Sequence, residues 1–229
     1  MPFRCFSRKC SEHRNDLGKC LESRLLDTIN EMKLFRLGSF GLFVLAVMSA
    51  GAATAQSSDA PGLANATVLV IRHGEKPDSG TGLAPAGEAR AKAYVKYFQT
   101  LKIGSATFKP DWMFASMDTK KSFRERLTLD PLGKAARVPV DCLFKNNQYQ
   151  ELANAMKYKP FGKNIIICWH HGNIPKLVQA LGADSSKLIP GGKWPDEVFD
   201  WVLELRYDSK GHIIPSQTKR VKEDIKLNQ

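Results

Sequence analysis

Between residues 66 and 182, short apolar runs rich in β-branched residues alternate with longer segments of helical character. This alternation predicts a mostly parallel sheet with helices on both faces, because parallel neighbours are joined by a crossover helix. The runs 198–207 and 212–216 flank Asp208-Ser209-Lys210-Gly211, which predicts a hairpin at the sheet edge. We therefore expect an α/β fold: a three-layer sandwich with a C-terminal edge hairpin.

The expected elements follow one another without internal repeats. A loop is expected at 183–197, since it contains Pro190-Gly191-Gly192 and Trp194-Pro195. The expected strands cover 66–71, 111–116, 138–143 and 164–169, and the expected helices cover 86–103, 120–136, 147–158 and 174–182.

The first strand ends directly at Arg72-His73-Gly74. In open α/β sheets, ligands bind beyond the carboxyl ends of the strands. A histidine at this point can attack a substrate or carry protons, and the planar fork of the adjacent arginine can hold an anion. The triplet is therefore a candidate anion-binding and catalytic site.

Three further motifs follow in order. They are Gly82-Leu83-Ala84-Pro85-Ala86-Gly87-Glu88-Ala89-Arg90-Ala91, Ser122-Phe123-Arg124-Glu125-Arg126-Leu127-Thr128, and a strand that ends in Trp169-His170-His171-Gly172-Asn173-Ile174-Pro175. Together with the strand before Arg-His-Gly, they resemble the histidine phosphatase superfamily, also called phosphoglycerate-mutase-like. The first is similar to the family's L-T-x-x-G-x-x-R-A helix opening and the second to its S-x-R-x-x-x-T. The third resembles its second-histidine segment, in a W-x-H-x-x-I-P variant.

The resemblance implies a phosphate cage that uses no metal and no cofactor. His73 would be the nucleophile that forms a phosphohistidine, and Arg72 and Arg124 would hold the phosphate through charge-assisted hydrogen bonds. Gly74 would let the backbone approach the phosphate. Glu75 is assigned a catalytic role, in which it orients Arg72 or a site water; the alternative is that it faces solvent.

One histidine of the pair His170-His171 would complete the cage as a donor, with Gly172 opening the backbone at the following helix start. Two alignments to the family pattern are open. Without a gap, His170 takes the family position. With one residue deleted, His171-Gly172-Asn173 reproduces the family's H-G-N. We favour His171, with His170 as a supporting or packing residue.

The acid that protonates the leaving group is missing from its usual places. Relatives carry a carboxylate after the third strand or directly after the second histidine, where this chain has Lys145-Asn146-Asn147 and Gly172-Asn173. Asp141, Asp196 and Glu197 remain as candidates. Two functions compete: a metal-independent phosphomonoesterase acting on a small phosphate ester or a phosphorylated envelope component, and a non-catalytic phosphate-binding module. Mutase activity is less expected.

The segment from Met32 combines a basic start, a short apolar run and Ala53-Thr54-Ala55, the three parts of a secretory signal peptide. We expect residues 1–31 to be a mis-assigned upstream extension, 32–55 to be the signal, 56–65 a linker and 66–229 the phosphatase-like domain. The domain would then be periplasmic or secreted. The alternative is a membrane anchor formed by 37–58, if that segment stays uncleaved.

The chain has a formal net charge of +11, and residues 56–229 keep 26 Lys and Arg against 18 Asp and Glu. A basic surface favours acidic partners such as phosphate esters. The basic residues are scattered and no nucleic-acid motif is present, so we expect no nucleic-acid partner. Cys142 and Cys168 lie in expected strands; they either form a disulfide in an oxidising compartment or pack as buried thiols.

Overall fold

The computed structural model describes residues 62–227. The expected upstream extension, the signal peptide and the linker as far as residue 61 lie outside the described residues. Within the described range, no helix has the length and apolar character that crossing a bilayer requires.

A six-stranded sheet forms the centre of the domain, in the order β5-β4-β6-β1-β7-β8. The pairs β5–β4, β4–β6 and β6–β1 are parallel, and β7 runs antiparallel to both β1 and β8. Its strands are β1 (Thr67–Arg72), β4 (Trp112–Ala115), β5 (Val140–Asp141), β6 (Asn164–Trp169), β7 (Trp201–Arg206) and β8 (Lys219–Lys222).

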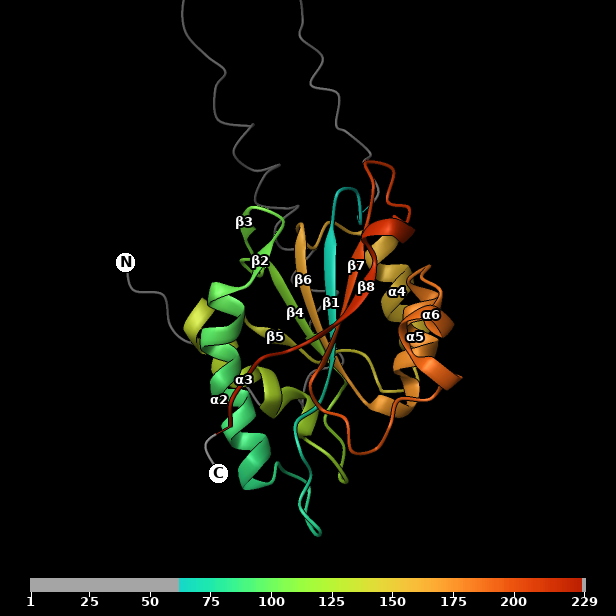
Figure 1. Cartoon of the computed structure of the whole chain (residues 1–229). Coiled ribbons are helices and arrows are strands. Elements are labelled where there is room, and N and C mark those ends of the chain that lie inside the picture. Colours follow the sequence, from blue (N-terminus) through green and yellow to red (C-terminus); the bar gives the residue numbers. More distant parts are fainter. Residues whose placement is uncertain (1–61, 228–229) are drawn as a thin grey trace, which may run out of the picture. The chain divides into compact units, whose positions relative to one another are not determined.

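Helices cover both faces of this sheet (Figure 1). On one side lie α2 (Pro85–Thr100) and α3 (Arg124–Ala136), and on the other lie α4 (Tyr149–Tyr158), α5 (Ile174–Ala180) and α6 (Ser185–Leu188). The expected three-layer α/β sandwich with a mostly parallel sheet is confirmed.

The side chains of β1 alternate between the two faces of the sheet. Val68 and Val70 pack with α4 and α5, whereas Leu69 and Ile71 pack with α2 and α3. All four side chains are at most 1% exposed. A strand covered on both faces needs apolar residues at every position, which is why the first strand is an unbroken apolar run rather than an alternating one.

The C-terminal hairpin is present, but its second strand is not at 212–216. β7 pairs with β8 at 219–222, and within 212–216 only Ile213 forms a bridge, with Tyr207. Pro215 has no amide N–H to donate to a strand and instead begins the short 3-10 turn Pro215–Gln217. The pairing strand is therefore displaced toward the C-terminus.

Other boundaries also differ from the sequence expectation: the helix expected at 120–136 begins at Arg124, and the strand expected at 138–143 is limited to Val140–Asp141. The helix expected at 86–103 ends at Thr100, and the chain then turns through Gly104 in a small hairpin of β2 (Lys102–Ile103) and β3 (Ala106–Thr107). The φ of Gly104 is 63°, a left-handed conformation that glycine adopts without steric cost. The loop expected at 183–197 contains the short helix α6.

Residues 62–65, expected to belong to the linker, are packed against the domain. Leu63 and Ala64 are 1% and 2% exposed, and Leu63 belongs to the core between the sheet and α4. A Cβ on Gly62 would lie 2.2 Å from the carbonyl oxygen of Lys159, so the backbone itself is in close contact there. The packed domain therefore includes these four residues.

The two cysteines of the domain do not form a disulfide with each other. Cys168 is fully buried in β6 and packs in the core between the sheet and α2 and α3. Burial raises the pKa of its thiol well above the ordinary value. Cys168 therefore acts as a small apolar residue of the core.

Candidate functional site

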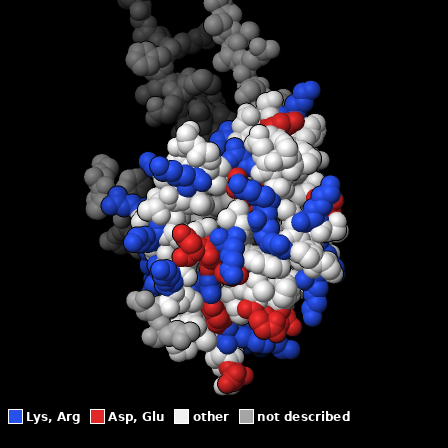
Figure 2. Space-filling view, in the orientation of Figure 1, with Lys and Arg blue, Asp and Glu red and all other residues white. Residues whose placement is uncertain are grey.

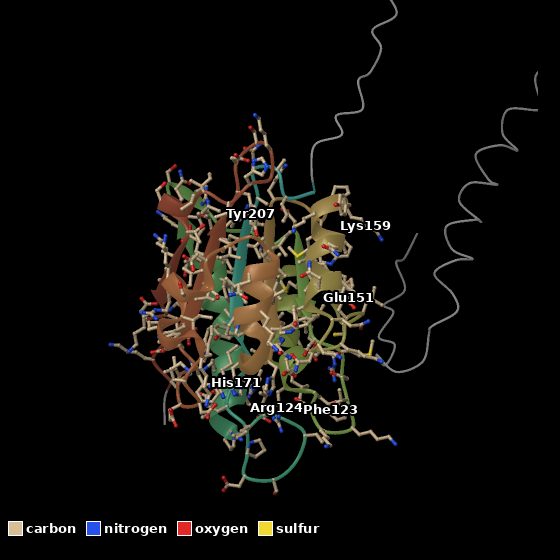
Figure 3. All side chains as sticks on the ribbon, turned by 90° about the vertical axis from the view of Figure 1, so that its right-hand side faces the viewer. Phe123, Arg124, Glu151, Lys159, His171 and Tyr207 are labelled. Carbon is tan, nitrogen blue, oxygen red and sulfur yellow. The ribbon has the colours of Figure 1, made fainter. Side chains whose placement is uncertain are left out.

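The candidate site lies at the carboxyl ends of β1 and β6, which are neighbours in the sheet. In their parallel register Arg72 is opposite Trp169, so the residues that follow, His73 and His170, leave the sheet side by side. Figure 3 shows His171 and Arg124 at this end of the domain, whereas Tyr207 lies toward the other end. The fold thus brings the motifs of the sequence to one place.

Three histidine rings meet at this end. The centroid of the His73 ring lies 5.8 Å from that of His170 and 5.9 Å from that of His171, and the His170 and His171 rings stack at 4.4 Å. The hydrogen bonds of each ring determine which of its nitrogens carries a proton. The three rings differ in this respect.

The ring of His73 presents a lone pair on Nε2. Its Nδ1 lies 2.7 Å from the carbonyl oxygen of Gly74. A carbonyl only accepts hydrogen bonds, so Nδ1 carries the proton and Nε2 does not. Burial, together with the charge of Arg72, lowers the pKa of His73 to about 3, which keeps the ring neutral at neutral pH. A neutral imidazole with a free Nε2 is the form that can attack phosphorus.

The ring of His170 has the opposite arrangement. Its Nδ1 accepts a hydrogen bond of 3.2 Å from the amide of Gly172, so in the neutral ring Nε2 carries the proton. Burial and the nearby guanidinium groups of Arg72 and Arg124 lower the pKa of His170. His170 can therefore donate a hydrogen bond from Nε2 to an anion while it remains neutral.

The ring of His171 is held by a carboxylate. Its Nε2 lies 3.0 Å from Oδ1 of Asp196, and burial lowers the pKa of His171 to about 4. The neutral ring donates from Nε2 to the carboxylate, which leaves the lone pair on Nδ1. That Nδ1 is buried and has no hydrogen-bond partner among the described residues.

Arg72 is buried at 2% exposure and anchors the loop before β7. One terminal nitrogen, Nη1, donates to the carbonyls of Pro195, Asp196 and Val198 at 3.1, 2.6 and 3.0 Å. Its guanidinium carbon lies 3.9 Å from the centre of the Phe199 ring. Burial lowers the pKa of Arg72 to about 10, so it stays charged at neutral pH. The Nε of Arg72 is a buried donor without an acceptor in the described structure.

Arg124 lies at the start of α3 and faces the loop that follows Glu75. It donates from Nε to the carbonyl of Gly82 and from Nη2 to the carbonyl of Gly80, both at 3.1 Å. Its charge also lowers the pKa of His170, which indicates that it acts on the histidine cluster. Backbone carbonyls hold this guanidinium in place without neutralising it.

Arg126, two residues further, is neutralised by carboxylates. Its Nε lies 2.8 Å from Asp118 and its Nη1 lies 2.7 Å from Asp130. A guanidinium held by two carboxylates is poorly suited to bind a phosphate as well. Of the two arginines, Arg124 is therefore the one whose guanidinium is held by backbone carbonyls rather than by carboxylates.

Glu75 binds an arginine other than Arg72, and its side chain is only 20% exposed. Orientation of a site water, the other role expected for it, stays a prediction. The Glu75 carboxylate accepts from Arg90 of α2, at 2.6 Å from Nη2 and at 3.0 and 3.1 Å from Nε. Arg90 is buried and also pairs with Glu223, which follows β8. Glu75 thus fastens the loop after His73 to α2 and, through Arg90, to the C-terminal segment.

Gly74 lies in close backbone contact with the start of α2. A Cβ on Gly74 would lie 3.1 Å from the Cα of Gly87, and a Cβ on Gly87 would lie 2.6 Å from the carbonyl oxygen of Glu75. Both glycines therefore let the loop after β1 contact the first turn of α2. At Gly172, a Cβ would lie 3.3 Å from Nδ1 of His170, the atom that its amide donates to.

Of the three candidate acids, the structure brings only Asp196 to the histidines. Asp141 accepts a hydrogen bond of 3.0 Å from the amide of Leu143, on the far edge strand β5. Glu197 is exposed. Asp196 lies against His171, a contact that the sequence could not indicate because the two residues are far from each other in the chain and belong to different segments.

One nitrogen from each of His73, His170 and His171 lies within 4.8 Å of the others, a spacing that a metal ion could bridge. The hydrogen bonds leave lone pairs on His73 Nε2 and His171 Nδ1, but a proton on His170 Nε2. The guanidinium of Arg72 adds a positive charge beside the rings. This combination of donors and positive charge suits an anion better than a divalent cation.

No family model and no curated protein matches the chain. Among solved structures, it is similar to a protein histidine phosphatase SixA in complex with tungstate, with 15% identity over 68% of this chain and 96% of that one at a TM-score of 0.41. A SixA-type putative phosphohistidine phosphatase from Agrobacterium tumefaciens is 15% identical over 69% of this chain and 96% of that one, with a TM-score of 0.42. A phosphoglycerate mutase from Plasmodium falciparum is 17% identical over 66% of this chain and 89% of that one, with a TM-score of 0.44.

Proposed function

We propose that the chain is a phosphomonoesterase that works through a phosphohistidine on His73. The observation that carries this proposal is the buried, neutral ring of His73, with Nδ1 held by the Gly74 carbonyl and Nε2 left as a nucleophile. Beside it, Arg72 keeps a buried Nε donor for which the described structure offers no acceptor. An oxygen of a bound phosphate satisfies that donor.

The proposed first step transfers the phosphoryl group to the protein. The lone pair of His73 Nε2 forms a bond to phosphorus as the bond from phosphorus to the ester oxygen breaks. Arg72, Arg124 and the Nε2–H of His170 donate to the remaining oxygens, where charge is held in the transition state. In the second step water attacks the phosphohistidine, which releases phosphate and restores His73.

The charges of the site favour a dianion. Arg72 and Arg124 bring two positive charges to the histidine rings. Burial lowers the pKa of His73 and of His170, with a further contribution from Arg72 to both and from Arg124 to His170. A phosphate monoester supplies the negative charge that these cations lack. His170 rather than His171 fits the donor role in this cage, since the Nε2–H of His171 is already given to Asp196. The preference for His171 drawn from the sequence stays a prediction that mutation can decide.

The substrate class follows from the location proposed for the domain. The segment 32–55 supports export, so we propose a small phosphate ester or a phosphorylated envelope component as substrate. Figure 2 shows basic side chains spread over one face and interspersed with acidic ones, without a single basic stripe on that face. A reporter fused after residue 60 and active only outside the cytoplasm tests export, and its retention in the cytoplasm would contradict it.

Hydrolysis of a chromogenic aryl phosphate by the full chain, with EDTA present, tests the proposed function. We expect hydrolysis that EDTA leaves unchanged, that His73→Ala abolishes and that His212→Ala retains. His212 is a suitable control because its side chain is exposed on the turn after β7. Binding of vanadate without hydrolysis would contradict the proposal and support the non-catalytic phosphate-binding module instead.

A further inference from the structure

We propose that His171, positioned by Asp196, is the general acid and base of this site and replaces the carboxylic acid that the sequence lacks. This inference rests on the proposed function, because it assigns the proton transfers of that reaction. Neither the sequence motifs nor the expected phosphate cage gives His171 this role.

The first support is the direction of the His171 ring. The carboxylate of Asp196 accepts from Nε2 at 3.0 Å, so the second nitrogen, Nδ1, keeps its lone pair. Nδ1 is buried without a partner in the described structure, although its ring centroid is only 5.9 Å from that of His73. A carboxylate that fixes one ring nitrogen and leaves the other with its lone pair is the arrangement by which histidine serves as acid and base.

The second support is that the loop of Asp196 is held by the site itself. Nη1 of Arg72 donates to the carbonyls of Pro195, Asp196 and Val198. The fully buried Trp194 adds a hydrogen bond of 2.8 Å from Nε1 to the carbonyl of Val198. The backbone of Asp196 is therefore fixed, although its side chain is 59% exposed. Arg72, which is proposed to bind phosphate, thus also holds the backbone of Asp196, which orients His171.

The third support is that other carboxylates have different partners. Glu75 is bound by Arg90, and Asp141 accepts from the Leu143 amide on the far edge strand. The places where relatives carry an acid hold Asn146 and Asn173 here. In the described structure the amide of Asn173 donates to the carbonyl of Asn146, at 3.3 Å. Asparagine amides do not donate protons to a leaving oxygen, whereas the free ring nitrogen of His171 can carry one.

The proton transfers balance over the two steps. When the ester binds as a dianion, its charge favours protonation of His171, and Nδ1 takes up one proton from solvent. As Nε2 of His73 bonds to phosphorus, the leaving oxygen takes that proton and departs as the alcohol. Nδ1 then removes a proton from the attacking water, whose oxygen bonds to phosphorus while the bond to His73 breaks. His171 returns the proton to the departing phosphate.

The test uses two aryl phosphates of matched shape with different leaving groups, 4-nitrophenyl and 4-methylphenyl phosphate. Nitrophenolate leaves without a proton, whereas methylphenolate needs one. We expect His171→Ala to lower kcat/KM for the methylphenyl ester by about 10²–10⁴-fold, the usual contribution of general acid catalysis, and to spare the nitrophenyl ester. Asp196→Asn should produce the same selective loss, and the neighbouring Glu197→Gln should change neither rate.

An equal loss on both esters, or no loss on either, would overturn the proposal. Equal loss would show that His171 serves binding or folding, and vanadate binding by the same variants separates these two causes. Because the Asp196 side chain is largely exposed, Asp196→Asn keeps the test decisive if His171→Ala fails to fold. If the unmodified chain hydrolyses neither ester, the proposed function itself fails and this inference falls with it.

Discussion

The backbone amide of Gly74 donates a hydrogen bond of 2.9 Å to the hydroxyl of Thr128, and this hydroxyl donates at 2.7 Å to the carbonyl of Arg124. The loop after His73 is thereby fastened to α3 one turn from the arginine proposed to hold phosphate. Thr128 is fully buried, so this bond is shielded from water. The two hydrogen bonds fix the position of the proposed nucleophile, His73, relative to that of the proposed phosphate ligand, Arg124.

Replacing Thr128 with valine should test this connection. Valine keeps the shape but offers no acceptor, so the amide of Gly74 is left buried without a partner at a cost of about 1–3 kcal/mol. Urea unfolding should show that loss in the free energy of unfolding, together with reduced phosphatase activity. Thr128→Ser keeps the hydroxyl and should lose less. A valine variant as stable as the parent would show that the bond contributes nothing.

Gly87→Ala should displace the loop that carries His73. The added methyl would lie 2.6 Å from the carbonyl oxygen of Glu75 and 2.8 Å from its amide nitrogen, and backbone atoms cannot move aside cheaply. We expect reduced stability, by about 1–3 kcal/mol as for other overpacked sites, and a lower kcat. Gly82→Ala is the matched control, because its methyl would meet only the Leu127 side chain at 3.8 Å. Similar effects of the two substitutions would contradict the role given to Gly87.

Arg124→Ala should weaken the binding of vanadate, a phosphate analogue. Removal of a charge-assisted hydrogen bond costs about 1.5–3 kcal/mol, or about 10- to 150-fold in Kd. Arg126→Ala should leave vanadate binding near the parental value, because Asp118 and Asp130 already neutralise Arg126. Isothermal titration calorimetry measures the Kd of vanadate for both variants. Weak binding by Arg126→Ala alone would show that the motif register is wrong.

The two adjacent histidines should separate in the same titration. His170→Ala removes the Nε2–H donor and should weaken vanadate binding, whereas His171→Ala should keep most of it while losing turnover of poor leaving groups. The different hydrogen bonds of the two rings are the reason for this expectation. The reverse result for vanadate would assign the cage position to His171, as the gapped alignment of the sequence favours.

Stability should depend on pH through His73. Burial lowers the pKa of this ring from 6.5 to about 3, so between these values the unfolded chain binds a proton that the folded chain does not. The free energy of unfolding therefore falls as the pH decreases from about 6.5, with a slope of up to about 1.4 kcal/mol per pH unit from this group. His73→Gln should flatten that slope in urea unfolding measured at several pH values. An unchanged slope would contradict the burial of a neutral His73.

Local patterns were sufficient to predict the two central buried strands of the sheet. The strand ending at Ile71 or Arg72 is an unbroken apolar run, and the buried strand 164–169 has the same character, so both were identified within one residue. β8 was misplaced because Lys219–Lys222 is mostly exposed and basic, and lacks the apolar alternation that marks a strand. β8 lies at the edge of the sheet and pairs only with β7, so its side chains do not need to be apolar.

The sequence indicates positions where residues are adjacent in the chain and gives no sign of contacts between residues that are distant in it. Arg72 and His73 share one strand end, which the sequence shows directly. The contact between Asp196 and His171 depends on the loop that Arg72 holds through backbone carbonyls. Every residue has a backbone carbonyl, so the sequence does not indicate which carbonyls accept these hydrogen bonds. The bond between Glu75 and Arg90 depends likewise on how α2 packs on the loop. Only the folded arrangement reveals such contacts.

The measurement that tests the account most directly is the trapping of the phosphoenzyme. The full chain is incubated briefly with a phosphate ester that carries radioactive phosphorus and is then denatured. We expect label on the protein that survives base and is lost in acid, as a phosphorus–nitrogen bond requires; it should be absent from His73→Ala and present in His212→Ala. Label that persists in His73→Ala, or that resists acid, would contradict the assignment of His73 as the nucleophile.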